Sequence, residues 1–193
     1  MTARAVILAT GMTPNRLGVL GEAELIGNGV SYFADNYGPT THDKNVLVVG
    51  GDNSGLQAVQ EVAPVAARVH VLTRGGWTGD PDRITAAQEF DNVEMLPAAT
   101  VQRIEGDERV ERVVIALAED DTEQTLDIDL IFVEIGFRPA TAIVKDLVEL
   151  NDHGEVIGDR ENLTGIPGLF AAGDGARAAL SAKRFVRPGD WGG

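Results

Sequence analysis

The most constraining feature of the chain is an apolar segment, a glycine-rich turn and an amphipathic segment that follow one another directly. Residues 45–49 (NVLVV) are apolar, residues 50–55 (GGDNSG) supply the turn, and residues 56–63 repeat apolar side chains at helical spacing. A second apolar run, RVHVLT, follows at 68–73. This order predicts a parallel β-α-β unit, the arrangement that places the diphosphate of a dinucleotide at a helix N-terminus.

The turn departs from the glycine pattern GxGxxG at one position. Gly50 and Gly55 match the first and last glycines, whereas Asp52 stands where the pattern has its second. We expect Gly50 to allow the tight turn and Gly55 to allow close packing of the helix. The backbone amides of Asn53 and Ser54 are predicted to face the diphosphate, and one of these two residues is the predicted N-cap.

Asp52 leaves two alternatives open. In the first, its carboxylate occupies the helix N-terminus, because the helix dipole favours any anion there. In the second, its side chain turns outward and binding survives. Two unit charges about 4 Å apart repel by ~4 kcal/mol at an effective dielectric constant near 20, so the first alternative weakens binding of a diphosphate.

The end of the run at 68–73 is where a dinucleotide-binding unit carries the side chain that reads the adenosine ribose. Thr73 and Arg74 stand at this point. A guanidinium group pairs well with a phosphate, so Arg74 predicts a preference for NADP(H) over NAD(H). The alternative is a solvated loop arginine, and Arg83 is a second, weaker candidate cation.

The rest of the chain predicts the other layers of an α/β fold. Residues 5–9 and 129–136 are apolar runs typical of buried strands, and residues 82–90 have a helical pattern. Residues 99–129 alternate polar and apolar side chains between turn sequences, which is typical of an antiparallel β-meander. We expect this meander to connect parallel strands and cover one face of their sheet. Residues 12–44, rich in Gly, Pro and Asn, are predicted to be loop.

Toward the C-terminus the predicted elements are shorter. Residues 154–158 and 168–174 are strand-like, and residues 176–186 are predicted to form a final helix. Pro64 is expected in the last turn of the first helix or just beyond it.

Composition excludes several kinds of chemistry. The chain has no cysteine, so disulfides, thiolate metal sites and thiol nucleophiles are ruled out within it. The three histidines, His42, His70 and His153, show no metal-ligand spacing, and no metal site is predicted. Glu134 lies inside an apolar run, so we expect it to be paired, protonated or on an exposed face. It is interpreted as structural, and the alternative is that it marks a site. No side chain stands out as a catalytic acid, base or nucleophile, so no catalytic residue is assigned.

Charge and hydropathy restrict partners and location. The net charge of −14 argues against nucleic acid and anionic membrane surfaces. No apolar run approaches the ~20 residues of a membrane-spanning helix. Residues 1–11 are interpreted as a strand rather than a signal peptide, and the expected location is cytoplasmic.

Four segments with functional character occur in a fixed order: ATG at 9–11, GGDNSG at 50–55, IGFRPAT at 135–141 and TGIPGLFAAGD at 164–174. Their order and spacing resemble the thioredoxin reductases and their relatives, the low-molecular-weight pyridine nucleotide-disulfide oxidoreductases, which include the flavoprotein component of alkyl hydroperoxide reductase. The similarity covers nearly the whole chain.

In that family the nicotinamide domain is inserted into a split FAD domain. The resemblance therefore implies an FAD-domain remnant at 1–23, an NAD(P)(H)-binding domain at 24–137 and a second FAD-domain remnant at 138–193. The implied fold class is α/β: a three-layer Rossmann-like unit with a parallel sheet and a β-meander, flanked by incomplete FAD-domain segments.

The resemblance also implies a set of cofactor-binding residues. Asp174 is the expected contact to the FAD ribityl chain, because a carboxylate accepts hydrogen bonds from sugar-like hydroxyls, and Gly173 lets the backbone approach. The alternative is that this pair merely ends a strand and caps a helix. The full set is Gly50, Gly51, Asp52, Asn53, Ser54, Gly55, Thr73, Arg74, Gly136, Gly173 and Asp174.

The chain departs from the family at two functional places. The family's FAD pyrophosphate motif lies upstream of the ATG segment, and this sequence starts just before ATG. We therefore expect half of the FAD site to be absent, so NADP(H) is the expected cofactor and FAD is possible with an incomplete site. The family's CxxC would fall where this chain has Phe33 and Asn36, and the acid that follows it is replaced by Tyr37. Dithiol chemistry is therefore impossible for these residues.

The resemblance implies an NADPH-preferring, FAD/NAD(P)-binding oxidoreductase that lacks dithiol chemistry. Two alternatives stay open. One is a non-catalytic nucleotide-binding or interaction module, and the other is one half of a split flavoenzyme completed by a partner chain that carries the rest of the FAD domain. A homodimer is a further possibility, because incomplete domain segments expose apolar surface.

Overall fold

A computed structural model describes residues 3–34, 38–118 and 122–172. The chain divides into two compact units, Pro14–Gly136 and the combination of Met1–Thr13 with Phe137–Gly193. Residues 14–23, which the resemblance places with the first FAD-domain remnant, therefore pack within the larger unit.

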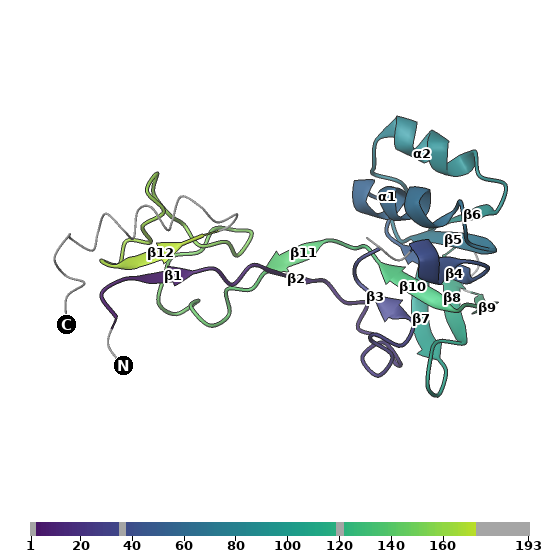
Figure 1. Ribbon diagram of the computed structural model, residues 1–193, viewed down its shortest axis with the longest axis horizontal. Coiled ribbons are helices and arrows are strands. Elements are labelled where there is room, and N and C mark those ends of the chain that lie inside the picture. The colour runs from purple at the N-terminus through teal and green to yellow at the C-terminus, as the bar shows by residue number, and fades with distance from the viewer. Residues whose placement is uncertain (1–2, 35–37, 119–121, 173–193) are drawn as a thin grey trace. The chain divides into compact units, whose positions relative to one another are not determined.

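The larger unit is built on a parallel sheet (Figure 1). Its strands pair in the order β3, β10, β4, β5, β6, and every pairing is parallel. The strands are β3 (Val30–Ser31), β10 (Leu130–Val133), β4 (Asn45–Val49), β5 (Arg68–Thr73) and β6 (Val93–Pro97). The predicted strands at 45–49 and 68–73 are confirmed, and that at 129–136 is confirmed over Leu130–Val133.

Two helices cover one face of this sheet. They are α1 (Asn53–Val62) and α2 (Pro81–Gln88). Val46 and Val48 of β4 point toward them, into a core that includes Leu56 and Val59 of α1. Each such buried side chain contributes roughly 1.5–3 kcal/mol of hydrophobic stabilisation.

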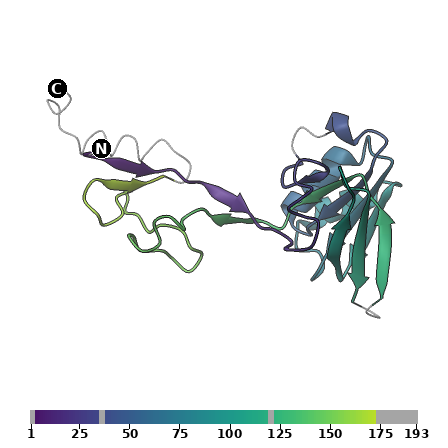
Figure 2. The same cartoon turned by 90° about the horizontal axis from the view of Figure 1, so that it is seen from below.

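An antiparallel meander covers the opposite face, and Figure 2 shows its strands side by side. It consists of β7 (Ala99–Glu105), β8 (Arg112–Leu117) and β9 (Glu123–Asp127). Leu47 and Val49, the β4 residues that alternate with the helix-facing valines, pack against it in a second core. Because β4 is buried on both faces, its sequence is continuously apolar. The predicted three-layer unit, with a meander on one face, is confirmed.

The helix boundaries differ slightly from those predicted. The N-cap of α1 is Asp52 rather than Asn53 or Ser54, because the Asp52 carboxylate accepts hydrogen bonds from the amides of the first turn. Pro64 lies just beyond the C-cap of α1. Helix α2 begins at Pro81, after the N-cap Asp80, and ends at Gln88 rather than at residue 90.

The segment 12–44 is less irregular than predicted. It contains β2 (Met12–Pro14), β3 and the 3-10 helix η1 (Gly38–Thr41). These short elements form because each is paired with or packed on distant residues. Local composition does not reveal such contacts.

In the described residues, the smaller unit contains two short strand pairs. One joins β1 (Val6–Leu8) to β12 (Leu169–Ala171) in parallel, and the other joins β2 to β11 (Phe137–Pro139). The predicted strand at 154–158 is wrong, since only an isolated bridge forms there. The Asn151 side chain accepts hydrogen bonds from the amides of two following residues, which folds this segment into a turn. The predicted helix at 176–186 lies outside the described residues.

Candidate functional site

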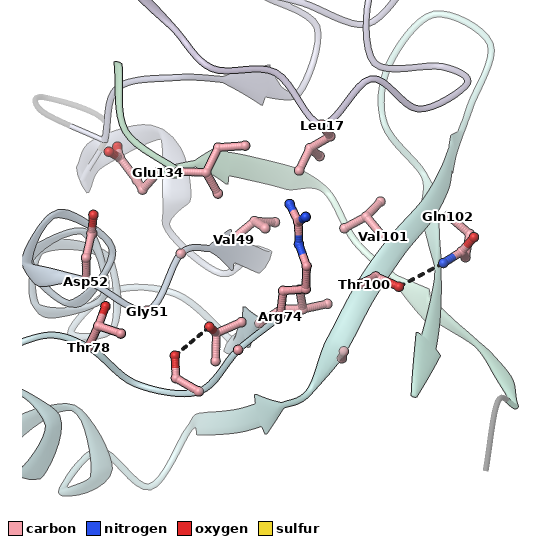
Figure 3. A pocket seen from close by; sticks show the side chains of 17 residues that line it. Leu17, Val49, Gly51, Asp52, Arg74, Thr78, Thr100, Val101, Gln102 and Glu134 are labelled. Carbon is pink, nitrogen blue, oxygen red and sulfur yellow. Dashed lines mark hydrogen bonds between the residues drawn. The ribbon is translucent and has the colours of Figure 1, made fainter. Parts of the chain in front are cut away.

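A cavity of about 580 Å³ opens in the larger unit where β4, β5 and β10 end (Figure 3). The crevice beyond the carboxyl ends of parallel strands is where open α/β sheets bind ligands. It is lined by the glycine turn, the loop after β5, the start of β7, the end of β10 and the turn that carries Leu17, together with the ends of β4 and β5. The lining residues are Leu17, Val49, Gly50, Gly51, Asp52, Leu72, Thr73, Arg74, Gly75, Gly76, Thr78, Ala99, Thr100, Val101, Gln102, Glu134 and Ile135.

The glycine turn is tightly enclosed by backbone. The Gly50 amide donates to the Leu72 carbonyl at 2.9 Å, which holds the turn against the end of β5. A Cβ atom at Gly50 would collide with the Glu134 carbonyl, and a Cβ atom at Gly55 would collide with the Gly50 carbonyl. Both glycines are therefore required by packing, as the sequence argument predicted for the turn and for the helix.

Asp52 adopts the first of its two alternatives. Its Oδ1 accepts hydrogen bonds from the Ser54 amide at 3.0 Å and from the Gly55 amide at 3.1 Å. In Figure 3 its side chain stands at the beginning of α1. The carboxylate thus occupies the positive end of the helix dipole. The Ser54 amide, which the sequence assigned to a diphosphate, is bonded to the protein's own side chain.

The loop after β5 folds against the glycine turn. The Gly51 carbonyl accepts from the Thr78 amide at 2.8 Å and from the Gly79 amide at 3.0 Å. The Asn53 side chain accepts from the Asp80 amide at 2.8 Å. Asn53 therefore fixes this loop and the start of α2 in place, a role that the sequence did not predict.

Thr73 and Arg74 both line the cavity, but in different ways. Thr73 is buried, and its hydroxyl donates to the Gly76 carbonyl at 2.7 Å, so this donor is used within the loop. Arg74 is exposed, and Figure 3 shows its side chain pointing into the cavity toward Leu17. Within the described part of the chain, no hydrogen bond or ion pair engages its guanidinium group. Arg74 is thus available to an anionic ligand.

The second candidate cation is elsewhere. The Arg83 guanidinium group, on α2, donates to the Gln60 side chain at 3.5 Å, and Arg83 does not line the cavity. Gly136 does not line it either, although its neighbours Glu134 and Ile135 do. Its carbonyl accepts from the Asn15 amide at 2.9 Å.

Several lining residues were missed by sequence reasoning. Thr100 and Gln102 of β7 form one wall, where the Gln102 amide donates to the Thr100 hydroxyl at 2.8 Å. The predicted meander implied that some strand passes over the sheet, but its alternating pattern does not say which residues reach the carboxyl edge. Glu134, interpreted as structural, is buried and also lines the cavity.

Leu17 reaches the cavity from a turn held by a buried carboxylate. Glu22 accepts from the Leu17 amide at 2.9 Å, the Gly18 amide at 2.7 Å and the Tyr32 hydroxyl at 3.0 Å. Burial, together with the hydrogen bond to Glu22, raises the pKa of Tyr32 to about 12. Glu22 was not singled out from the sequence, because nothing local marks it as buried.

The remaining predicted positions fall outside the site or outside the described residues. Phe33 is exposed in the larger unit, whereas Asn36, Tyr37, Gly173 and Asp174 lie outside the described residues. His70 is buried on β5, where burial lowers the pKa of its imidazole. No cluster of metal-ligating side chains occurs in residues 3–34, 38–118 and 122–172. No helix in those ranges is long and apolar enough to cross a membrane.

The chain is similar to several known reductases. The F subunit of alkyl hydroperoxide reductase in Staphylococcus aureus (strain Mu50) is 33% identical over 202 residues, which cover 96% of this chain and 40% of that protein. The chain thus spans less than half the length of this curated relative. A thioredoxin reductase from T. acidophilum superposes with a TM-score of 0.78 at 29% identity, covering 94% of this chain and 66% of that one.

Two further solved structures share the fold. The thioredoxin reductase of Lactococcus lactis superposes with a TM-score of 0.79 at 24% identity, over 94% of this chain and 65% of that one. The bacillithiol disulfide reductase Bdr of Staphylococcus aureus superposes with a TM-score of 0.70 at 26% identity, over 88% and 53%. A family model described as pyridine nucleotide-disulphide oxidoreductase matches residues 1–189. The resemblance inferred from the four sequence segments is confirmed, and the chain belongs to the pyridine nucleotide-disulphide oxidoreductase family, among its thioredoxin reductase-like members.

Proposed function

We propose that the cavity binds NADPH, with the 2′-phosphate of the adenosine ribose at Arg74. The observation that carries the proposal is the position of Arg74, directly after β5, with its side chain directed into a cavity at the carboxyl edge of the sheet. A guanidinium group forms charge-assisted hydrogen bonds with a phosphate. NADH lacks the 2′-phosphate and would leave Arg74 without a partner.

The residues of the cavity fit such a ligand. Its volume of about 580 Å³ lies within the usual range of small-molecule sites. Gly51 brings bare backbone to the cavity edge, where a Cβ atom would lie 2.8 Å from the Gly76 carbonyl and the Thr73 hydroxyl. Thr100 and Gln102 supply polar groups on the facing wall. When bound, a reduced nicotinamide supplies a hydride.

The wider activity is proposed from the family. We propose that the larger unit, Pro14–Gly136, forms the NAD(P)(H)-binding part of a thioredoxin reductase-like oxidoreductase, and that residues 1–13 and 137–193 belong to its FAD-binding part. The absence of any thiol in the chain supports a reaction that uses no internal dithiol. FAD bound through Gly173 and Asp174 is part of the same proposal.

The test is calorimetric titration with NADPH and NADH of the native chain, Arg74→Ala and Arg83→Ala. Arg83→Ala is the matched control, because it removes the same charge from outside the cavity. We expect Arg74→Ala to weaken NADPH binding at least tenfold and to leave NADH binding unchanged, since one charge-assisted contact is worth about 1.4 kcal/mol or more. Equal weakening of both ligands would contradict the assignment of the 2′-phosphate to Arg74.

A non-catalytic nucleotide-binding module is the second candidate. The hydrogen bonds of Asp52 favour it, because they occupy donors that a working dinucleotide site uses. Visible absorbance of the purified chain distinguishes the candidates. Bound flavin supports the oxidoreductase, whereas a colourless protein that still binds NADPH supports the module or one half of a split enzyme.

A further inference from the structure

The three glycine positions of the turn have different physical requirements. At Gly50 and Gly55 a side chain is excluded by neighbouring backbone carbonyls. At Asp52 the backbone has φ −92° and ψ −172°, an extended conformation open to any residue. A glycine at position 52 is therefore not needed by this fold. Its remaining physical role would be to let a ligand's diphosphate approach the helix.

The side chain at this position supplies an anion of its own. The two hydrogen bonds of Asp52, at 3.0 Å and 3.1 Å, use the first-turn amides on which a ligand diphosphate would depend. A diphosphate placed here would also face the like charge of the carboxylate. The helix N-terminus is thus occupied by the protein itself.

The cavity nevertheless holds a cation for a ligand. Arg74 points into it from the end of β5, with its guanidinium group not engaged by the described residues. The polar wall of Thr100 and Gln102 lines the same cavity. The cavity therefore offers a phosphate partner at the ribose end of a dinucleotide and an anion at the diphosphate end.

We propose that Asp52 is an internal substitute for the ligand's diphosphate, so that the cavity recognises the 2′-phosphoadenosine half of NADPH. The inference rests on the proposed function at the same cavity and adds which part of the ligand supplies the affinity. An adenosine 2′-phosphate that lacks a diphosphate meets Arg74 and avoids Asp52.

The test compares two ligands, NADPH and 2′-AMP, on the native chain, Asp52→Asn, Asp52→Gly and Asp80→Asn. Asparagine is as good an N-cap as aspartate, and glycine is tolerated at this position, so the variants retain α1. Asp80→Asn is the matched control, because Asp80 caps α2 in the same way, by accepting from the Asp82 amide at 3.0 Å, and does not line the cavity. Circular dichroism verifies the fold of each variant.

We expect native protein to bind 2′-AMP within about tenfold of its affinity for NADPH. Asp52→Gly should tighten NADPH at least about tenfold and change 2′-AMP by less than about threefold, with Asp52→Asn between native and glycine. Asp80→Asn should change neither. Equal tightening of both ligands would overturn the inference, because it would show a general charge effect. Unchanged binding of both would also overturn it.

The two proposals fail in distinguishable ways. If native protein binds NADPH and Asp52→Gly binds it equally well, the inference is wrong while the proposed function stands. If only Asp52→Gly binds NADPH, Asp52 does substitute for the diphosphate and the native chain is not an NADPH-binding protein. If neither ligand binds any variant, both proposals are wrong.

Discussion

Glu22 is the side chain whose replacement most directly tests how the wall of the cavity is held. It is only 3% exposed, and its two oxygens accept three hydrogen bonds. Two of them come from the amides of Leu17 and Gly18, and the third comes from the Tyr32 hydroxyl. A buried carboxylate is stable here because its charge is shared among these donors.

Glu22→Gln keeps the shape of the side chain but replaces one acceptor oxygen by an NH₂ group. Whichever way the amide turns, at least one donor at this site faces another donor. The loss combines a charged hydrogen bond, worth about 1.5–3 kcal/mol, with the cost of an unsatisfied buried donor. Lower desolvation of a neutral amide offsets part of it. We expect the free energy of unfolding to fall by about 2–3 kcal/mol, or roughly 4–12 °C in Tm.

The assay is urea unfolding followed by far-UV circular dichroism, with Glu24→Gln as the control. Glu24 is exposed, so its substitution should change stability by less than about 0.5 kcal/mol. Glu22→Gln should also weaken NADPH binding, because Leu17 is displaced from the cavity wall. If Glu22→Gln and Glu24→Gln change stability equally, the three donors do not depend on a buried charge and the reasoning is refuted.

Two further predictions concern Tyr32 and the glycine turn. Because the folded pKa of Tyr32 is about 12 and its ordinary value is 10.0, stability should fall as pH rises from about 10 through about 12, since the unfolded chain ionises first. Tyr32→Phe should remove this alkaline loss in denaturant titrations; a loss that persists would show that Tyr32 is not its source. Gly55→Ala should destabilise by about 1–3 kcal/mol in the same assay, despite the higher helix propensity of alanine, because its Cβ collides with the Gly50 carbonyl. Gly75→Ala is its control, since a Cβ atom there meets open space, and equal effects would contradict the collision.

The layers of the fold were predictable because each has its own periodicity. The continuous apolar run of β4 indicates a strand buried on both faces, and it packs between the helices and the meander. The alternation within 99–129 indicated antiparallel strands, and β7 to β9 pair in that way, although β8 buries three consecutive residues, Val113 to Ile115. These patterns involve residues that are close together in the chain, so they can be recognised in a single sequence.

The parts that sequence reasoning missed depend on individual side-chain contacts rather than on the periodicity of the sequence. Glu22 accepts its third hydrogen bond from Tyr32, which lies ten residues away in the chain. The strand predicted at 154–158 does not form, because the side chain of Asn151 accepts hydrogen bonds from backbone amides that a strand would use. The cavity wall at Gln102 depends on how the meander crosses the sheet edge. None of these contacts produces a periodic pattern in the sequence.

The glycine pattern GxGxxG combines two requirements, one for the fold and one for binding a diphosphate. Asp52 shows that this chain meets the first without the second. Gly50 and Gly55 are required because neighbouring backbone atoms leave no room for a side chain, so their presence indicates that the strand-turn-helix fold forms. Position 52 has an ordinary extended backbone, so an aspartate there costs the fold nothing and even caps the helix. A strong structural match to dinucleotide-binding enzymes is therefore expected whether or not a diphosphate binds. Binding of a diphosphate depends on the side chain at position 52, and exchanging Asp52 alone separates the capacity to fold from the capacity to bind that group.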